Sequence, residues 1–332
     1  MERRATSLEK EEIIMTEKER KTRIQNRLKA HYDYIESLGY EIVGVFLQGS
    51  QNYDLDIYDE DYTSDVDTKC LVIPKLDALI KGAPMVSKKY DFEGEQIDVK
   101  DIRVMMEMWK KQNQAYLEIL FTKYKIINPK YKFYIDEILG MKDEIVKINP
   151  PQLARCISGM SKEKVCALEH EYPATAEKIE RFGYDPKQLA SIIRLTHLIE
   201  NIFVEGKSFD IAMLYIDDEL KKYMIDIKKG KIELKEARQL ANIYDEKTYS
   251  IKTNVVEQYG KNVFNSETYE KLESIVYELV KFGIISGVVD MQKDAFKELC
   301  DMMVPSDFDD ATCKVIEELS VEHKENFLDY YE

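Results

Sequence analysis

The segment FLQGSQNYDLDIYDEDYTSDVDTKCLVI, residues Phe46 to Ile73, contains a Gly-Ser turn after one apolar run and an Asp-Val-Asp inside the next. The whole chain already carries a formal net charge of -15. Further carboxylates on a strand that must be buried repel one another unless a cation neutralises them. The segment therefore predicts a cation-binding site at the edge of a small sheet.

The Asp-Val-Asp is expected to present both carboxylates on the same side. Side chains of a strand alternate between its two faces, which places Asp65, Asp67 and Lys69 together on one face. Hard oxygen ligands of this kind suit Mg²⁺ or Mn²⁺, which complete their shell with water and substrate phosphates. We therefore expect a divalent metal ion held by Asp65 and Asp67.

Two neighbouring segments extend this expected site. Gly49 allows a ligand to approach the backbone closely, and the Ser50 hydroxyl with nearby amide N–H groups can bind a phosphate. In the following strand EQIDVKDI, residues Gln96, Asp98 and Lys100 share a face. Asp98 is expected to share the metal and to accept the proton of an attacking hydroxyl.

The hydrophobic pattern predicts strands first and helices afterwards. Three or four strands are expected within residues 41–101, with a hairpin turning at Glu93-Gly94, and a short extended piece is expected at KYKIINP. The expected helices cover residues 8–38, 101–121, 130–146, 151–170, 186–205, 217–229, 233–247, 267–302 and 307–329. The pair Pro150-Pro151 indicates a boundary. The expected fold class is α+β, with a small mixed sheet flanked by helices in residues 1–148 and an all-helical domain in residues 149–332.

Composition restricts the class of protein. The 332 residues are enough for two domains, and no apolar run approaches the ~20 residues of a membrane span. The charged N-terminus lacks the apolar core of a signal peptide, so we expect a cytoplasmic protein without a membrane partner. Five irregularly spaced cysteines argue against a disulfide framework. The acidic net charge argues against binding to long duplex DNA.

The quoted segments FLQGS, SDVDTKCLVI and IDVKDI resemble the nucleotidyltransferase superfamily typified by DNA polymerase beta. The closer likeness is to the YcgL-like predicted nucleotidyltransferases of bacteria and phages. It continues in QAYLEILF and in the helix YDPKQLASIIRLTHLIENIFVEG, and it covers roughly residues 40–240. The resemblance implies a nucleotidyltransferase domain over residues 1–148.

The resemblance also implies a reaction. An NMP would pass from ATP or another NTP to an acceptor hydroxyl with release of pyrophosphate, and the catalytic residues would be Asp65, Asp67 and Asp98. The nucleotide would be bound by Gly49, Ser50, Lys69, Lys187 and Arg194. On the residues alone, Lys187 and Arg194 share the polar face of an amphipathic helix, which is compatible with a solvated face as well.

The chain departs from the relatives at two positions of these motifs. Asp54 stands where they usually have Gly, and Ser191 stands where they have His. The acceptor stays open between an RNA 3′ end such as that of tRNA, a small molecule and a protein side chain, and the sequence does not give the oligomeric state. A rival hypothesis is a catalytically inert nucleotide-sensing or partner-binding protein that uses the helical domain. An EF-hand loop at DLDIYDED is rejected because Tyr58 occupies an acidic position.

Overall fold

The computed structural model describes residues 15–58, 63–260 and 263–302, with side chains described as far as residue 294. The chain divides into two compact units between Lys281 and Phe282. The expected helix at 307–329 lies outside the described residues, as does the beginning of the expected helix at 8–38.

The sheet has five strands in the order β3-β4-β2-β1-β5. The strands are β1 (Glu41–Leu47), β2 (Thr68–Ile73), β3 (Ser87–Phe92), β4 (Glu95–Asp101) and β5 (Lys125–Ile127). β1 pairs antiparallel with β2 and β5, whereas β2 and β4 run parallel. β3 and β4 form the expected hairpin, and both turn residues, Glu93 and Gly94, have positive φ. Together with the helices, this mixed sheet confirms the α+β class.

Helices make up most of the remaining chain. They are α1 (Glu17–Ser37), α2 (Leu76–Ile80), α3 (Ile102–Lys110), α4 (Gln114–Leu117), α5 (Lys132–Gly140), α6 (Lys142–Ile145), α7 (Pro150–Ala167), α8 (Ala176–Phe182), α9 (Pro186–Phe203), α10 (Phe209–Leu214), α11 (Asp218–Lys228), α12 (Leu234–Tyr259) and α13 (Ser266–Met302). Short 3₁₀ turns lie at η1 (Ser50–Tyr53), η2 (Glu118–Leu120) and η3 (Pro129–Tyr131).

Several helices differ from the expected boundaries. The helix expected over residues 130–146 is divided into η3, α5 and α6, and α2, α8 and α10 were not expected. The helix expected over residues 101–121 is interrupted after α3, because Gln112 has a φ of 53° and Asn113 starts α4 by accepting the N–H of Ala115. Helix α12 continues to Tyr259 rather than stopping at residue 247, since no Gly or Pro occurs before Gly260.

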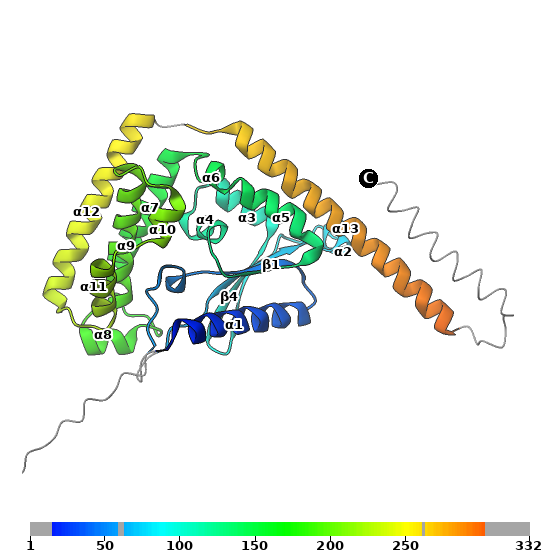
Figure 1. Ribbon diagram of the computed structural model, residues 1–332, viewed down its shortest axis with the longest axis horizontal. Coiled ribbons are helices and arrows are strands. Elements are labelled where there is room, and N and C mark those ends of the chain that lie inside the picture. The colour runs from blue at the N-terminus through cyan, green and yellow to red at the C-terminus, as the bar shows by residue number, and fades with distance from the viewer. Residues whose placement is uncertain (1–14, 59–62, 261–262, 303–332) are drawn as a thin grey trace, which may run out of the picture. The chain divides into compact units, whose positions relative to one another are not determined.

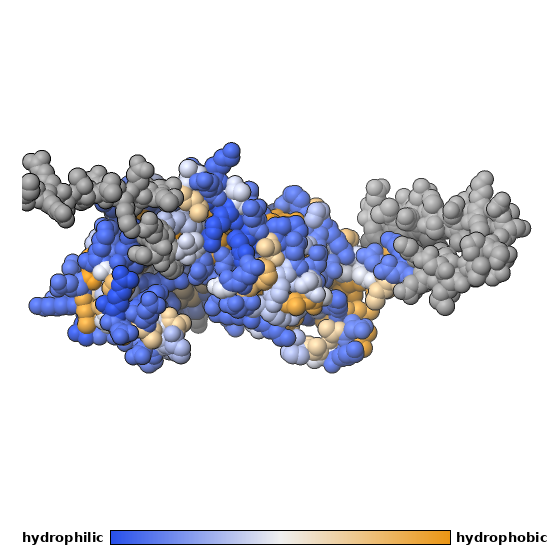
Figure 2. All heavy atoms as spheres, turned by 90° about the horizontal axis from the view of Figure 1, so that it is seen from below, coloured by the Kyte–Doolittle hydropathy of each residue, from blue (hydrophilic) through white to orange (hydrophobic). Residues whose placement is uncertain are grey.

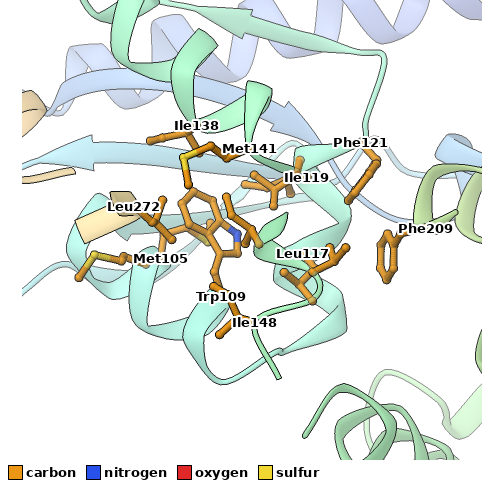
Figure 3. Close-up of a cluster of buried hydrophobic side chains, with 14 of the residues drawn as sticks. Met105, Trp109, Leu117, Ile119, Phe121, Ile138, Met141, Ile148, Phe209 and Leu272 are labelled. Carbon is orange, nitrogen blue, oxygen red and sulfur yellow. The ribbon is translucent and has the colours of Figure 1, made fainter. Parts of the chain in front are cut away.

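Helices cover both faces of the sheet. On one face, Ile24, Leu28 and Ile35 of α1 pack against the strands. On the other face, Trp109 of α3 lies in the largest core cluster, surrounded by residues such as Met105 and Leu117 (Figure 3). Burial on both faces explains why β1 reads as a continuous apolar run rather than as an alternating strand.

The helical part packs directly onto the sheet part within residues 1–281. Helices α7, α9 and α12 lie side by side, and α11 packs on α9 (Figure 1). Tyr53 and Leu55, which follow β1, are buried in the cluster formed by these helices. The largest core cluster contains residues from both sides of the expected boundary at 148/149, and that domain boundary stays a prediction.

The face of the molecule drawn in Figure 2 is mainly hydrophilic, with small scattered apolar patches. Within the described residues no helix combines the length and apolar character needed to cross a bilayer.

Candidate functional site

A cavity of about 250 Å³ lies where the loop after β1 and the segment before β2 face helices α9 and α11. Its charged walls come from opposite parts of the chain. The sheet side contributes Gly49, Ser50, Asp65, Asp67 and Glu118, and the helices contribute Lys187, Ser191, Arg194 and Lys228. The structure therefore brings together six of the sequence-predicted site residues, namely Gly49, Ser50, Asp65, Asp67, Lys187 and Arg194.

The Gly-Ser loop is held by a glutamate that the sequence motifs did not assign to the site. Glu118 Oε1 accepts hydrogen bonds from the N–H of Gly49 and from Nδ2 of Asn52, each at 3.0 Å. Gly49 has a φ of 89°, a conformation that favours glycine. The N–H of Gly49 is thus already bonded to Glu118, and the expectation that Gly49 and Ser50 bind a phosphate stays a prediction. The sequence signal for this role was a glutamate inside the apolar run LEILF, because a charged residue in such a run is rarely buried without partners. Glu118 is buried in the structure.

The Asp-Val-Asp segment lies directly before β2 rather than inside it. The carbonyl oxygen of Asp67 accepts the N–H of Gln48 at 3.0 Å, and side chains make the other hydrogen bonds described here. Gln51 Nε2 donates to the carbonyl oxygen of Asp65 at 2.6 Å. The N–H of Val66 donates to Glu95 Oε1 at 3.0 Å, and Asp67 Oδ1 accepts the N–H of Gln96 at 2.9 Å. These contacts fix the two aspartates at the cavity wall.

Glu95 is the centre of a buried polar cluster behind this segment. Arg27 Nε donates to Glu95 Oε2 at 2.6 Å, and the His31 ring lies 3.1 Å from the same oxygen. The other His31 ring nitrogen lies 3.0 Å from the hydroxyl of Thr68. Burial alone would raise the pKa of Glu95, but hydrogen bonds from His31 and Arg27 outweigh burial and lower it. Helix α1 therefore supports the acidic pair through Glu95.

Asp65 and Asp67 repel each other across the cavity wall. The pKa of the Asp65 carboxyl is raised, first by burial and second by the negative charge of Asp67, whereas Lys187 opposes the shift. This is the electrostatic situation that a bound cation would relieve.

Asp98, which was expected to share the metal with the acidic pair, is not among the residues that line the cavity. The parallel register of β2 and β4 places Asp98 next to Lys69, and its carboxylate lies 3.5 Å from Lys69 Nζ and 3.0 Å from Lys100 Nζ. The hydroxyl of Tyr116 donates to Asp98 Oδ2 at 3.3 Å. Asp98 is buried, with 3% of its surface exposed, and its Oδ1 has no hydrogen-bond partner among the described residues. Its expected share in a metal site stays a prediction.

Lys69 is also absent from the cavity lining, although it was expected to bind the nucleotide. Its ammonium group donates to Oε1 of Gln48, lies 4.3 Å from the ring centre of Tyr116 and is buried. Burial lowers the pKa of Lys69, against the opposing effect of Asp98. Lys69 therefore lies behind the cavity wall, where it supports Gln48, a lining residue.

The cationic wall contains one residue that sequence reasoning missed. Lys228, the last residue of α11, lines the cavity and donates through Nζ to the carbonyl oxygen of Leu55. Burial, followed by the nearby charge of Lys187, lowers the pKa of Lys228 to about 8. In the sequence, Lys228 is one of several basic residues at the end of a helix, and only tertiary packing distinguishes it.

Arg194 completes this wall. Its guanidinium lies 4.5 Å from the ring centre of Tyr53, a distance typical of a cation–π contact. Its Nη1 atom is buried and has no hydrogen-bond partner within the part of the chain that the structure describes. An anion entering the cavity could accept from this nitrogen.

Asp54 and Ser191, the two positions at which the sequence departs from the motifs it resembles, both form local contacts. Asp54 has a φ of 55°, in the left-handed region that favours glycine, and it forms ion pairs with Arg20 at 3.0 Å and Lys221 at 3.7 Å. Ser191 lines the cavity, and its hydroxyl donates to the carbonyl oxygen of Lys187 at 2.7 Å.

The donor set limits how a metal ion could be held. Over residues 15–58, 63–260 and 263–302, no three His, Cys, Asp or Glu side chains are grouped closely enough to hold a metal ion. Asp65 and Asp67 remain as two carboxylates at the cavity. Mg²⁺ is commonly bound by one or two carboxylates together with substrate phosphates, so the pair fits this ion without Asp98.

Comparison with known proteins gives little further information. No family model and no curated protein matches the chain. Among solved structures, the chain is similar to a nucleotidyltransferase-like protein from Exiguobacterium sibiricum, with 11% sequence identity and a TM-score of 0.28. The match covers 79% of this chain and 92% of that protein. With a TM-score this low, the match does not establish the fold or the activity of this chain.

Proposed function

We propose that the chain is a metal-dependent nucleotidyltransferase that moves an NMP from an NTP to an acceptor hydroxyl and releases pyrophosphate. The observation that carries this proposal is the division of one cavity into an acidic side, with Asp65 and Asp67, and a cationic side, with Lys187, Arg194 and Lys228. A nucleoside triphosphate with its divalent ion requires both kinds of wall.

Each wall has a separate task in this proposal. Lys187, Arg194 and Lys228 bind the phosphates by charge-assisted hydrogen bonds and orient the chain of phosphates along the cavity. Asp65 and Asp67 would hold Mg²⁺ or Mn²⁺, which when bound neutralises charge on the phosphates. We assign no proton transfer to Asp98, because its carboxylate forms ion pairs with Lys69 and Lys100 and does not line the cavity.

The resemblance in sequence supports the same reaction. The motifs around Gly49-Ser50 and Asp65-Val66-Asp67 match the nucleotidyltransferase pattern, and a relation to the YcgL-like group belongs to this proposal. The acceptor is an RNA 3′ end, a small molecule or a protein side chain, and a cytoplasmic location is part of the same hypothesis.

The test is transfer of label from each α-labelled NTP, with Mg²⁺ or Mn²⁺, to a pool of tRNA, aminoglycoside and protein acceptors. We expect label on one acceptor class, and we expect no label with a chelator or with the Asp65→Asn/Asp67→Asn double variant. The exposed Asp33→Asn serves as the matched control. Label transfer that survives in the double variant would contradict the proposal.

A second candidate is a protein that binds nucleotide or a partner without catalysis. Two observations favour it: Asp98 is ion-paired away from the cavity, and the N–H of Gly49 is already bonded to Glu118. This candidate predicts NTP binding without pyrophosphate release for every acceptor in the pool.

A further inference from the structure

One polar side chain of the cavity is not explained by phosphate or metal binding. Gln114, the first residue of α4, lines the cavity and has 0% of its surface exposed. Neither its Oε1 nor its Nε2 has a hydrogen-bond partner among the described residues. Its main chain is engaged normally, since its carbonyl oxygen accepts the N–H of Glu118 within the α4 and η2 turns.

A buried amide without partners is unfavourable for folding. Most buried polar atoms in native proteins are hydrogen-bonded, and leaving a donor and an acceptor unpaired destabilises the folded state. A methionine of similar size would pack at this position without that cost. The carboxamide of Gln114 therefore indicates a ligand that offers a donor and an acceptor side by side.

The surroundings of Gln114 favour a flat, apolar ligand with a polar edge. The cavity wall includes Ala115, Met160 and Met224 as well as Leu55. Thioether side chains pack well against aromatic rings. The charged residues of the cavity, in contrast, are already suited to phosphates and a metal ion.

We propose that Gln114 is the base-reading residue of the cavity, and that its carboxamide pairs with the edge of the nucleobase of the bound nucleotide. This inference rests on the proposed function. A carboxamide forms two parallel hydrogen bonds with a base edge that presents a neighbouring donor and acceptor, as glutamine does with adenine. Buried pairing of this kind rejects bases whose edge leaves the amide unpaired.

The test compares wild type with Gln114→Met, which keeps the size and removes both polar atoms, and with Gln114→Glu, which keeps only acceptors. Gln239→Met, at an exposed position of α12, is the matched control. Calorimetry measures binding of the four NTPs and of tripolyphosphate, each with Mg²⁺. Wild type should prefer one NTP about tenfold or more. Gln114→Met should remove that preference and leave the affinity for tripolyphosphate unchanged.

The possible outcomes distinguish a failure of the base-reading role of Gln114 from a failure of the proposed function. If NTPs bind with metal dependence but without base preference, or if Gln114→Met weakens all ligands equally, Gln114 does not read the base although the proposed function stands. If neither NTPs nor tripolyphosphate bind, both proposals fail. Thermal unfolding without ligand gives an independent readout: Gln114→Met should be at least as stable as wild type, and a clear loss of stability would mean that the amide has a structural role.

Discussion

The carboxylate of Glu118 accepts the backbone N–H of Gly49 at 3.0 Å, although the two residues are separated by 69 positions in the chain. The same oxygen accepts Nδ2 of Asn52. Since Gly49 and Ser50 line the cavity, the conformation of this wall depends on a residue that begins the 3₁₀ turn η2. Glu118 is thus a positioning residue for the Gly-Ser loop.

Replacing Glu118 by alanine should destabilise the protein and loosen the loop. The change leaves two buried or half-buried donors, the N–H of Gly49 and Nδ2 of Asn52, without their acceptor, which costs roughly 1–3 kcal/mol. Chemical denaturation should show this loss, and NTP binding should weaken as well. Glu118→Gln retains an acceptor oxygen and should keep most of the stability, while the exposed Glu257→Ala is the control. Equal stability of Glu118→Ala and Glu257→Ala would contradict this role.

Removing one charge of the acidic pair should weaken metal binding without destabilising the protein. Asp67→Asn keeps an oxygen that can accept the N–H of Gln96 and removes the repulsion that raises the pKa of Asp65. In buffer with a chelator, the variant should be as stable as wild type or slightly more stable, by up to about 1 kcal/mol. Mn²⁺ binding should weaken at least tenfold, since an amide is a poor ligand for this ion.

The sign of the pH dependence follows from the raised pKa of Asp65. Ionisation of Asp65 costs the folded state stability at pH values above its ordinary pKa of 3.8. Any gain from Asp67→Asn is therefore present near neutral pH and disappears as the pH falls toward 3.8. NMR titration should also show a lower pKa for Asp65 in the variant. An unchanged pKa would mean that the two carboxylates do not interact.

Replacing Asp98 by asparagine should destabilise the protein, whereas the same replacement at Asp67 should not. Asp98→Asn leaves the buried ammonium groups of Lys69 and Lys100 without their counter-charge, and breaking a buried ion pair in this way costs roughly 3–5 kcal/mol. Denaturant unfolding of the two variants in parallel provides the comparison. If Asp98→Asn were as stable as wild type, the carboxylate would be free of the lysines and available to the site, as the sequence motif alone suggested.

Lys228 should make stability depend on pH in the alkaline range. Its pKa is about 8 in the folded protein and 10.5 as the ordinary value. Between these values the unfolded chain binds more protons, so the free energy of unfolding of wild type should rise with pH relative to Lys228→Met. The full effect corresponds to roughly 3 kcal/mol, and partial exposure reduces it to on the order of 1–2 kcal/mol. Lys222→Met, at an exposed position of α11, is the control for the loss of a lysine from this helix. A constant difference between Lys228→Met and wild type over this range would show that the ammonium group is not desolvated.

Local sequence patterns were sufficient to predict part of the fold. Alternating apolar residues and the Glu93-Gly94 turn predict the β3–β4 hairpin, which the structure confirms. The proline at the start of α9 and the N-cap Asp185, which accepts the N–H of Lys187, mark the beginning of that helix. These features depend on neighbours within a few residues, which is why the sequence reveals them.

The remaining features depend on tertiary contacts. The parallel register that pairs Asp98 with Lys69 is set by packing between β2 and β4, and no local signal specifies it. The burial of Lys228 depends on the docking of α11 against the chain near Leu55. Likewise, Gln114 looks like an ordinary helix-start residue until the cavity is seen. A sequence pattern gives the residue types at a site, but only the packing shows which of them are already engaged.

Binding of NTP and NMP to wild type, Lys187→Ala and Arg194→Ala in the presence of Mg²⁺ tests the central claim most directly. Because both side chains line the cationic wall, each variant should lose about tenfold or more in NTP affinity, consistent with roughly 1.5–3 kcal/mol per charge-assisted contact, and much less in NMP affinity. Lys222→Ala, outside the cavity, should bind like wild type. Equal losses for NTP and NMP, or no loss in either variant, would show that the cationic wall does not hold the β- and γ-phosphates and would contradict the account.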